Sequence, residues 1–146
     1  MLSWADYSYT HYLDSLAAEL RAQHYSVRFL PFLYPCNFLP LAANATDMEP
    51  VRIDEDADFV LGQLMANNPE LNVLARLIPD TGREFTSQPV HMSTIFGTGQ
   101  RPHLLYKPKL FKKQSVLQVE LQDLTTVPNN IRLTFGGVKV ITRPLG

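Results

Sequence analysis

Apolar and polar side chains alternate with a period of two in the C-terminal part of the chain. Leu117, Val119 and Leu121 alternate with polar or charged residues, and the same pattern returns in residues 131–135. Successive side chains of a strand point to opposite faces of a sheet, so this period predicts strands with one buried and one solvated face. No helical period lies between these strands, which argues against strand–helix–strand units with a parallel sheet.

Short apolar segments separated by turn-forming residues recur along the chain after residue 24. The predicted strands cover residues 25–33, 51–53, 59–66, 71–78, 85–96, 103–111, 117–122 and 131–140. Such spacing is typical of a sandwich or a barrel, and long connections between sheets favour a jelly roll. We therefore predict an all-β protein, an antiparallel jelly-roll-like β-sandwich of about eight strands with an N-terminal α-helical arm.

Prolines and glycines make more specific predictions within this region. Prolines at positions 31, 35 and 40 keep the first strand from pairing centrally, and we expect residues 34–50 to form a crossing loop. Residues 79–82, Pro-Asp-Thr-Gly, predict a hairpin turn, and Pro89 makes residues 85–96 an edge strand or an extended crossing. The apolar parity changes at residues 136–137, which predicts a β-bulge there.

Residues 3–22 are the one segment with a clear helical pattern. Ser3 and Asp6 resemble a capping box at its start. The apolar positions then follow helical spacing, at Leu13, Leu16, Ala17 and Leu20. We expect residues 1–23 to form a helical arm and residues 24–146 to form the sandwich domain.

Composition limits the classes of ligand. The chain has 146 residues with 13 basic and 14 acidic side chains, so no overall positive field attracts nucleic acid. The single cysteine, Cys36, lies in an apolar run and is expected to be buried. No apolar run is long enough to span a membrane, and the first residues lack the pattern of a signal peptide. We expect synthesis in the cytoplasm of the producing cell.

Three short motifs resemble functional signatures but lack necessary residues. Asp80-Thr81-Gly82 matches the aspartic protease triplet, yet Pro79 and Arg83 flank it, and a hairpin turn explains the same residues. The acidic segment 54–58 has the rhythm of a calcium loop, but its glycine and final glutamate are missing. The loop 97–99 lacks the third glycine of a dinucleotide site. We expect no catalytic residues, no cofactor and no metal, and therefore no enzyme.

Aromatic and basic residues are the candidates for contact with a partner. Trp4, Tyr7, Tyr9 and Tyr12 make the first half of the predicted helix rich in the residue types that dominate protein interfaces. Packing of these rings on the chain's own sandwich is the alternative. Lys107 and Lys109 lie in a second cluster, which suits an edge strand or an acidic partner better than nucleic acid.

The layout of the last two thirds of the chain resembles that of a known class of proteins. The resemblance rests on an acidic turn before an apolar strand, a later Asp-Thr-Gly turn, a Pro-Val pair, a glycine loop followed by Arg-Pro, a proline-containing approach and the closing strands. These lie at residues 53–60, 80–85, 89–90, 95–99, 101–102, 107–111 and 133–140. This layout is similar to that of capsid cement or decoration proteins of tailed bacteriophages, which are small virion proteins with a jelly-roll sandwich.

The resemblance implies a structural role and not a chemical one. It implies that the chain cements or decorates a capsid by binding between capsid subunits, that its partners are the major capsid protein and copies of itself, and that it is located in the virion. It implies no nucleic acid, membrane or small-molecule substrate as partner. Two alternatives stay open: a head–tail connector, tail or fibre attachment component, and a carbohydrate- or receptor-binding β-sandwich.

Overall fold

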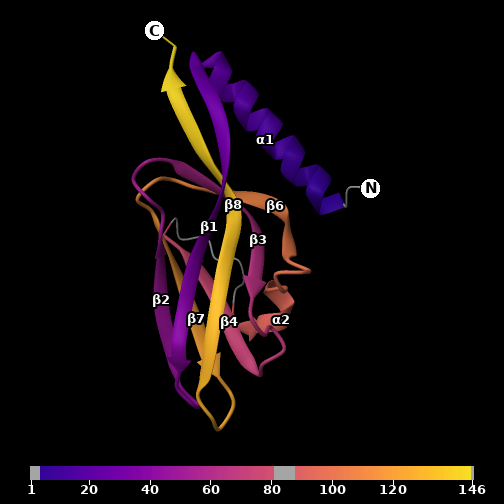
Figure 1. The fold of residues 1–146 in the computed structure, drawn as a ribbon, viewed down its shortest axis with the longest axis vertical. Coiled ribbons are helices and arrows are strands. Elements are labelled where there is room, and N and C mark those ends of the chain that lie inside the picture. The colour runs from indigo at the N-terminus through magenta and orange to yellow at the C-terminus, as the bar shows by residue number, and fades with distance from the viewer. Residues whose placement is uncertain (1–3, 81–87, 146) are drawn as a thin grey trace.

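A computed structural model describes residues 4–80 and 88–145, apart from the side chains of residues 4–8 and of Tyr106 (Figure 1). Its elements, in chain order, are α1 (Trp4–Ala22), β1 (Tyr25–Leu41), β2 (Thr46–Arg52), β3 (Asp58–Ala66), β4 (Val73–Pro79), β5 (Val90–His91), α2 (Met92–Ile95), β6 (His103–Phe111), β7 (Val116–Asp123) and β8 (Asn129–Pro144).

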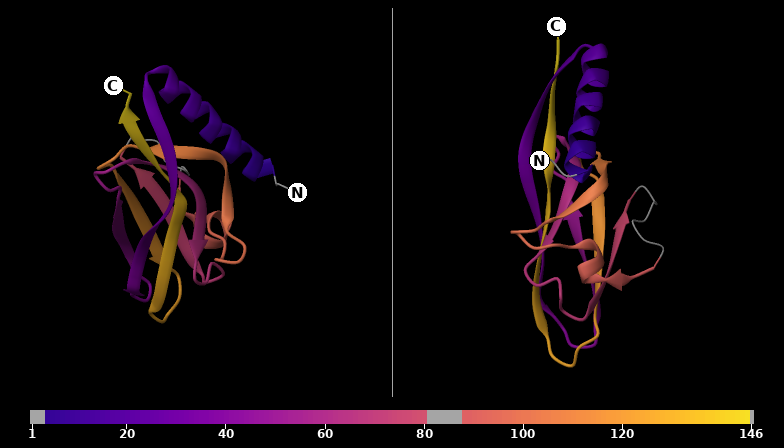
Figure 2. Two further views of the ribbon diagram at one scale, coloured as in Figure 1. Left: turned by 45° about the horizontal axis from the view of Figure 1, so that its top comes forward. Right: turned by 90° about the vertical axis from the view of Figure 1, so that its right-hand side faces the viewer.

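The strands form two antiparallel sheets of four strands each, in the orders β1-β8-β3-β6 and β2-β7-β4-β5 (Figures 1 and 2). The antiparallel pairs β1–β8, β2–β7, β3–β6 and β4–β5 nest inside one another along the chain. This nesting, folded over into two layers, is the arrangement of a jelly roll. The predicted fold class, an antiparallel jelly-roll-like sandwich with an N-terminal helix, is confirmed.

The space between the two sheets is filled by large apolar side chains. Phe38, Phe59 and Phe135 come from β1, β3 and β8 and are almost completely buried. Tyr34 packs edge-on against Phe59, with ring centroids 4.8 Å apart, a favourable geometry for aromatic pairs. Cys36 is buried in the same core, as the apolar sequence around it predicts.

A second, smaller apolar cluster lies on the outer face of the sheet β1-β8-β3-β6. Val60, Val138 and Val140 form its floor, and α1 covers them with the apolar side of its helical pattern. Leu13, Leu16 and Leu20 of α1 belong to this contact, so the helical spacing seen in the sequence is the spacing of a packed face. The division of the chain into a helical arm of residues 1–23 and a sandwich domain of residues 24–146 stays a prediction.

The prediction of a crossing loop over residues 34–50 is wrong. β1 continues to Leu41 and pairs with β8 in one unbroken register from Tyr25 to Phe38, and β2 begins at Thr46. The prolines at 31 and 35 are tolerated because β1 lies at the edge of its sheet. Proline therefore prescribes the position of this strand at the edge, and does not end the strand.

The predicted bulge at residues 136–137 is placed on the wrong strand. The register of β1 with β8 runs straight through Gly136 and Gly137, whereas the shift between β3 and β8 falls between Leu61 and Gln63. The extra residue is therefore Gly62 of β3. The change of parity in β8 has another cause, because Val138 and Val140 face α1 on the outer side of the sheet.

The segment 85–96 is only in part an edge strand. Within its described residues, β5 pairs with β4 at the sheet edge over Val90–His91, and the short helix α2 follows. Of the turn predicted at 79–82, Pro79 is the last residue of β4 and Asp80 lies in a turn, but Thr81 and Gly82 lie outside the described residues. Asp80 is anchored there, since its carboxylate accepts a hydrogen bond from the backbone N–H of Val116 at 3.0 Å.

Gly137 allows a close approach of β3 and β8 and supplies a test of the sheet. A Cβ atom at this position would overlap the carbonyl oxygen of Val60, whereas a Cβ at Gly99 would meet nothing within 4 Å. We expect Gly137→Ala to lower the free energy of unfolding by about 1–3 kcal/mol, the usual cost of overpacking. Urea denaturation measures it, with Gly99→Ala as the control. Equal stability of the two variants would contradict this close pairing of β3 with β8.

Candidate partner-binding surfaces

Two of the four aromatic residues proposed for partner contact lie against the chain's own sheet. Tyr9 and Tyr12 are partly buried in the contact between α1 and the outer face of the sheet. The hydroxyl group of Tyr9 donates a hydrogen bond of 3.4 Å to the carbonyl oxygen of Val60. Trp4 and Tyr7 lie in the first turns of α1, but their side chains are outside the described part. The interface role of these four residues stays a prediction.

The glycine at the bulge of β3 makes room for Tyr9. A Cβ atom on Gly62 would lie 2.6 Å from Cε2 of the Tyr9 ring. Burial raises the pKa of Tyr9 to about 12, because the phenolate would lose its water in this position. The bulge and the ring are thus parts of one contact, which holds the N-terminal half of α1 on the sheet.

The two candidate lysines lie on β6, the edge strand beside α1 (Figure 1). Lys107 is exposed and Lys109 is half-buried. The strand between them carries Pro108, so charge and proline together protect this edge from unwanted strand pairing. The structure therefore brings both lysines to the side of the molecule that also carries the helix, with Lys107 the more accessible of the two.

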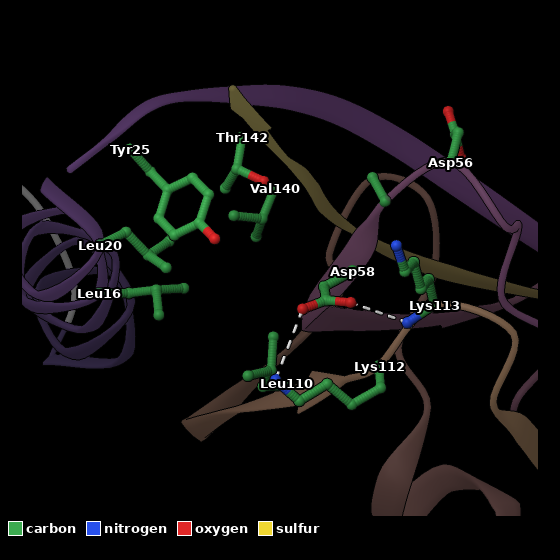
Figure 3. A pocket seen from close by; sticks show the side chains of 11 residues that line it. Leu16, Leu20, Tyr25, Asp56, Asp58, Leu110, Lys112, Lys113, Val140 and Thr142 are labelled. Atoms are coloured by element: carbon green, nitrogen blue, oxygen red, sulfur yellow. Dashed lines mark hydrogen bonds and ion pairs between the residues drawn. The ribbon is translucent and has the colours of Figure 1, made fainter. Parts of the chain in front are cut away.

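A pocket of about 280 Å³ separates the C-terminal half of α1 from the end of the sheet (Figure 3). Leu16 and Leu20 form its apolar wall on the helix side, and Asp58 stands at the opposite rim. The Asp58 carboxylate accepts a 2.8 Å hydrogen bond from the backbone N–H of Lys113 and lies 3.6 Å from the ammonium of Lys112. Its charge is thus already compensated, and the pocket presents an apolar wall with a neutralised rim.

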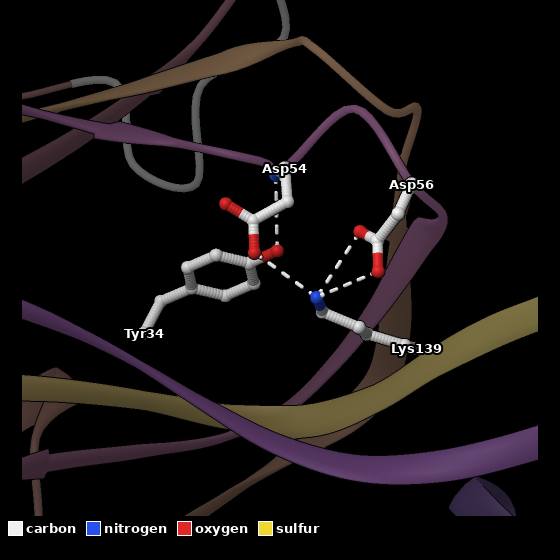
Figure 4. A network of polar contacts seen from close by, with 4 residues as sticks. All are labelled: Tyr34, Asp54, Asp56 and Lys139. Carbon is white, nitrogen blue, oxygen red and sulfur yellow. Dashed lines mark hydrogen bonds and ion pairs between the residues drawn. The ribbon is translucent and has the colours of Figure 1, made fainter.

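A nearly buried lysine organises the acidic turn between β2 and β3 (Figure 4). The ammonium group of Lys139 donates to Asp54 at 3.0 Å and to both carboxylate oxygens of Asp56 at 3.1 Å. It also lies 4.0 Å from the centroid of the Phe32 ring. The backbone N–H of Asp54 donates to the hydroxyl of Tyr34, so the turn is fixed to the core.

The carboxylates of this turn explain how Lys139 stays charged although it is buried in the sandwich. Burial alone would lower the pKa of Lys139, but the hydrogen bonds to Asp54 and Asp56 outweigh that effect and leave the pKa above its usual 10.5. The acidic segment that resembles a calcium loop therefore has an internal cation. Among the residues that the structure describes, no group of three or more His, Cys, Asp and Glu side chains is placed to hold a metal.

Other sequence candidates have structural roles. Tyr34 is buried in β1, whereas a carbohydrate-binding sandwich would need exposed aromatic rings. Burial raises the pKa of the Cys36 thiol to about 12, which keeps it in the unreactive protonated form. None of the described helices combines the length and the apolar character needed to cross a bilayer.

The end of the sandwich farthest from α1 exposes apolar side chains that sequence reasoning missed (Figure 1). Leu39, Leu124 and Val127, which we call the apolar tip, are 49%, 42% and 56% exposed. They belong to two adjacent parts of the chain, residues 38–46 and 124–131, and neither contains a charged residue. Interface centres in proteins are depleted of charge in the same way. In the sequence these segments look like ordinary turns.

A buried carboxylate keeps the apolar tip in one shape. Asp123 is almost completely buried and accepts hydrogen bonds from the N–H and the hydroxyl of Thr125, at 2.8 and 2.7 Å, and from the Asn129 amide at 3.0 Å. Burial would raise the pKa of Asp123, but these hydrogen bonds prevail and lower it. The backbone N–H of Asn44 donates to Thr125, which ties the two loops together. A preformed loop loses less conformational entropy on binding.

Three comparisons with known proteins bear on the fold of this chain. No family model and no curated protein matches it. Among solved structures, the fold is similar to that in the crystal structure of the infectious bursal disease virus VP2 subviral particle, with a TM-score of 0.34 and 13% sequence identity. The similarity covers 82% of this chain and 33% of the other, so this chain spans about a third of that protein. The strand order defines the class, a jelly-roll β-sandwich, and function has to be argued from the surfaces.

For the Lys139 network, we expect loss of the carboxylates to cost more stability than loss of the lysine. Lys139 has 7% of its side chain exposed, whereas Asp54 and Asp56 have 50% and 57%. Removing both carboxylates leaves a buried cation without a counter-ion. We therefore expect Asp54→Asn with Asp56→Asn to cost about 2–3 kcal/mol of stability. Lys139→Met leaves two hydrated carboxylates and should cost less than about 1 kcal/mol. Thermal or urea unfolding measures both variants. The reverse order would show that the ammonium is well hydrated.

Tyr9 makes the contact between helix and sheet sensitive to alkali. The unfolded chain ionises Tyr9 near the usual pKa of 10, and the folded chain only at about 12. The stability linked to this group is therefore complete below pH 10 and declines as the pH rises toward 12. Tyr9→Phe keeps the ring but not the ionisation, so its stability should fall less over this interval. An identical decline of stability in the wild type and in Tyr9→Phe would contradict the burial of the Tyr9 hydroxyl group.

Proposed function

We propose that this chain is a structural virion protein that cements or decorates a bacteriophage capsid by binding between capsid subunits. Its partners are then the major capsid protein and further copies of itself, and its location is the virion. We assign no enzymatic activity to the chain. The observation that carries the proposal is the apolar tip, a rigid surface without charge at the free end of a sandwich.

The architecture supports this proposal in two ways. Leu39 at the end of β1, together with Leu124 and Val127 on the loop that Asp123 holds in place, forms an exposed apolar surface, which suits a site that docks without rearrangement. A symmetric shell repeats each contact many times, so a modest surface per subunit is sufficient for firm attachment.

Two other roles remain as alternatives. A head–tail connector or a tail or fibre attachment component would use the same kind of surface at far fewer positions in the particle. Quantitative mass spectrometry of purified particles distinguishes the two, because a cement protein is present at a large fraction of the copy number of the shell protein. A carbohydrate- or receptor-binding role has less support, because Tyr34 is buried.

The apolar tip can be tested directly. We expect Leu124→Lys with Val127→Lys to weaken binding to particles at least tenfold, because each charge would have to be desolvated at the contact. Both positions are exposed, so the free energy of unfolding should change by less than about 0.5 kcal/mol. Leu145→Lys, at a side chain that is 59% exposed near the opposite end, is the control. Co-sedimentation with particles measures binding, and full binding by the double variant would contradict the proposal.

A further inference from the structure

Within the described part of the chain, the first strand of the sandwich has a backbone edge without a partner strand. β1 stands at the end of its sheet and pairs with β8 alone among the described strands. Its first residues, from Tyr25 to Leu30, extend beyond the opposite sheet together with the end of β8 (Figures 1 and 2). An unpaired edge offers N–H and C=O groups to any strand that can reach it.

The prolines of β1 show which backbone groups point to this edge. Pro31 is opposite Val138 and Pro35 is opposite Thr134, and proline has no N–H to give to β8. In an antiparallel pair, only every second residue exchanges hydrogen bonds with the neighbouring strand. Pro31 and Pro35 therefore belong to the set that faces the free edge. By the same period, Tyr25, Val27 and Phe29 direct their N–H and C=O groups outward.

This assignment divides the edge of β1 into a blocked half and an open half. Beyond residue 30, the prolines remove outward donors at positions 31 and 35. Residues 25–30 contain no proline and a single charge, on Arg28. The other edge strands are protected from pairing with a further strand. β6 carries Lys107 and Pro108, β2 carries charged residues and Pro50, and β5 is only two residues long. The open half of β1 is therefore unusual within the described sheets.

We propose that the open half of β1 pairs with the same segment of a second copy of this chain, as antiparallel strands about a two-fold axis at Val27. The pairing joins two four-stranded sheets into one continuous sheet. Val27 then faces Val27 of the second copy, and Tyr25 faces Phe29 in both directions. All three are of the outward set, so each exchanges hydrogen bonds across the axis.

The side chains are compatible with this register. Tyr25, Val27 and Phe29 have their side chains on the face that α1 covers, and each is half-buried. Opposite one another, Tyr25 and Phe29 would form the kind of aromatic cross-strand pair that stabilises sheets. On the other face, Ser26 lies opposite Arg28, so no two like charges are directly opposed. An isologous contact of this kind is self-complementary and closes as a dimer.

This self-association goes beyond attachment to a shell, and the two are tested by different measurements. Sedimentation of the purified full chain should show a dimer. Val27→Pro removes an outward N–H without removing a bond to β8, and we expect at least tenfold weaker association with an unchanged circular dichroism spectrum. Leu33→Pro has the same parity in the already blocked half and should remain dimeric. A monomeric wild-type chain, or a Val27→Pro variant that associates like it, would overturn the inference.

A cross-link tests the register even where Val27→Pro fails to fold. Residues 26 and 28 face each other across the axis as a non-hydrogen-bonded pair, with Cα atoms about 4.5 Å apart, which suits a disulfide. Both side chains are exposed, whereas the native Cys36 is buried. Ser26→Cys with Arg28→Cys should give covalent dimers on mild oxidation, and Ser26→Cys alone should not. Equal cross-linking of the two, or none in the double variant, would exclude the two-fold axis at Val27.

Discussion

The structure depends on the antiparallel ladder between β1 and β8, the first and last strands of the sandwich. It runs without interruption from Tyr25 opposite Pro144 to Phe38 opposite Ile131. Because β2–β7, β3–β6 and β4–β5 nest inside this outer pair, its register determines how the two sheets face each other. Such contacts join residues far apart in the sequence, so loop-closure entropy opposes their formation and folding of this topology is expected to be slow.

The same ladder explains how one sheet comes to be buried on both faces. Ile131, Leu133 and Phe135 of β8 face the main core, and Val138 and Val140 face α1. Lys139, between those valines, is left on the inner side near the mouth of the sandwich, where Asp54 and Asp56 meet it. The helix α1, the acidic turn and the bulge glycine Gly62 thus all contact one feature, the strand β8, which extends past the opposite sheet.

The sequence predicts the class of fold because a period of two survives in most strands. Prediction from the sequence fails where the role of a residue depends on contacts with distant parts of the chain. Pro31 and Pro35 look like strand breakers until the edge position of β1 is known. The change of parity at residues 136–137 looks like a bulge, because the covering of the outer face by α1 is a tertiary contact. Lys139 and its aspartates are separated by 85 and 83 positions, a distance at which pairing has no local signal.

The candidate surfaces were harder to predict than the fold. Aromatic residues in a terminal helix suggest a partner, but Tyr9 and Tyr12 pack on the chain's own sheet. The apolar tip lies in segments that read as turns, and only the exposure of Leu39, Leu124 and Val127 together distinguishes it. Composition cannot separate a buried aromatic from an interface aromatic, because both exclude water by the same physical effect.

The tip and the open edge of β1 lie toward opposite ends of the sandwich, so one subunit can hold a shell and a second copy at once (Figure 1). The most direct measurement is a cryo-electron microscopy map of phage particles that contain this chain. We expect ordered density for the sandwich at repeated positions between capsid subunits, with Leu39, Leu124 and Val127 at the contact. A map without density for the sandwich between capsid subunits, or with these three side chains in solvent, would contradict the proposed role.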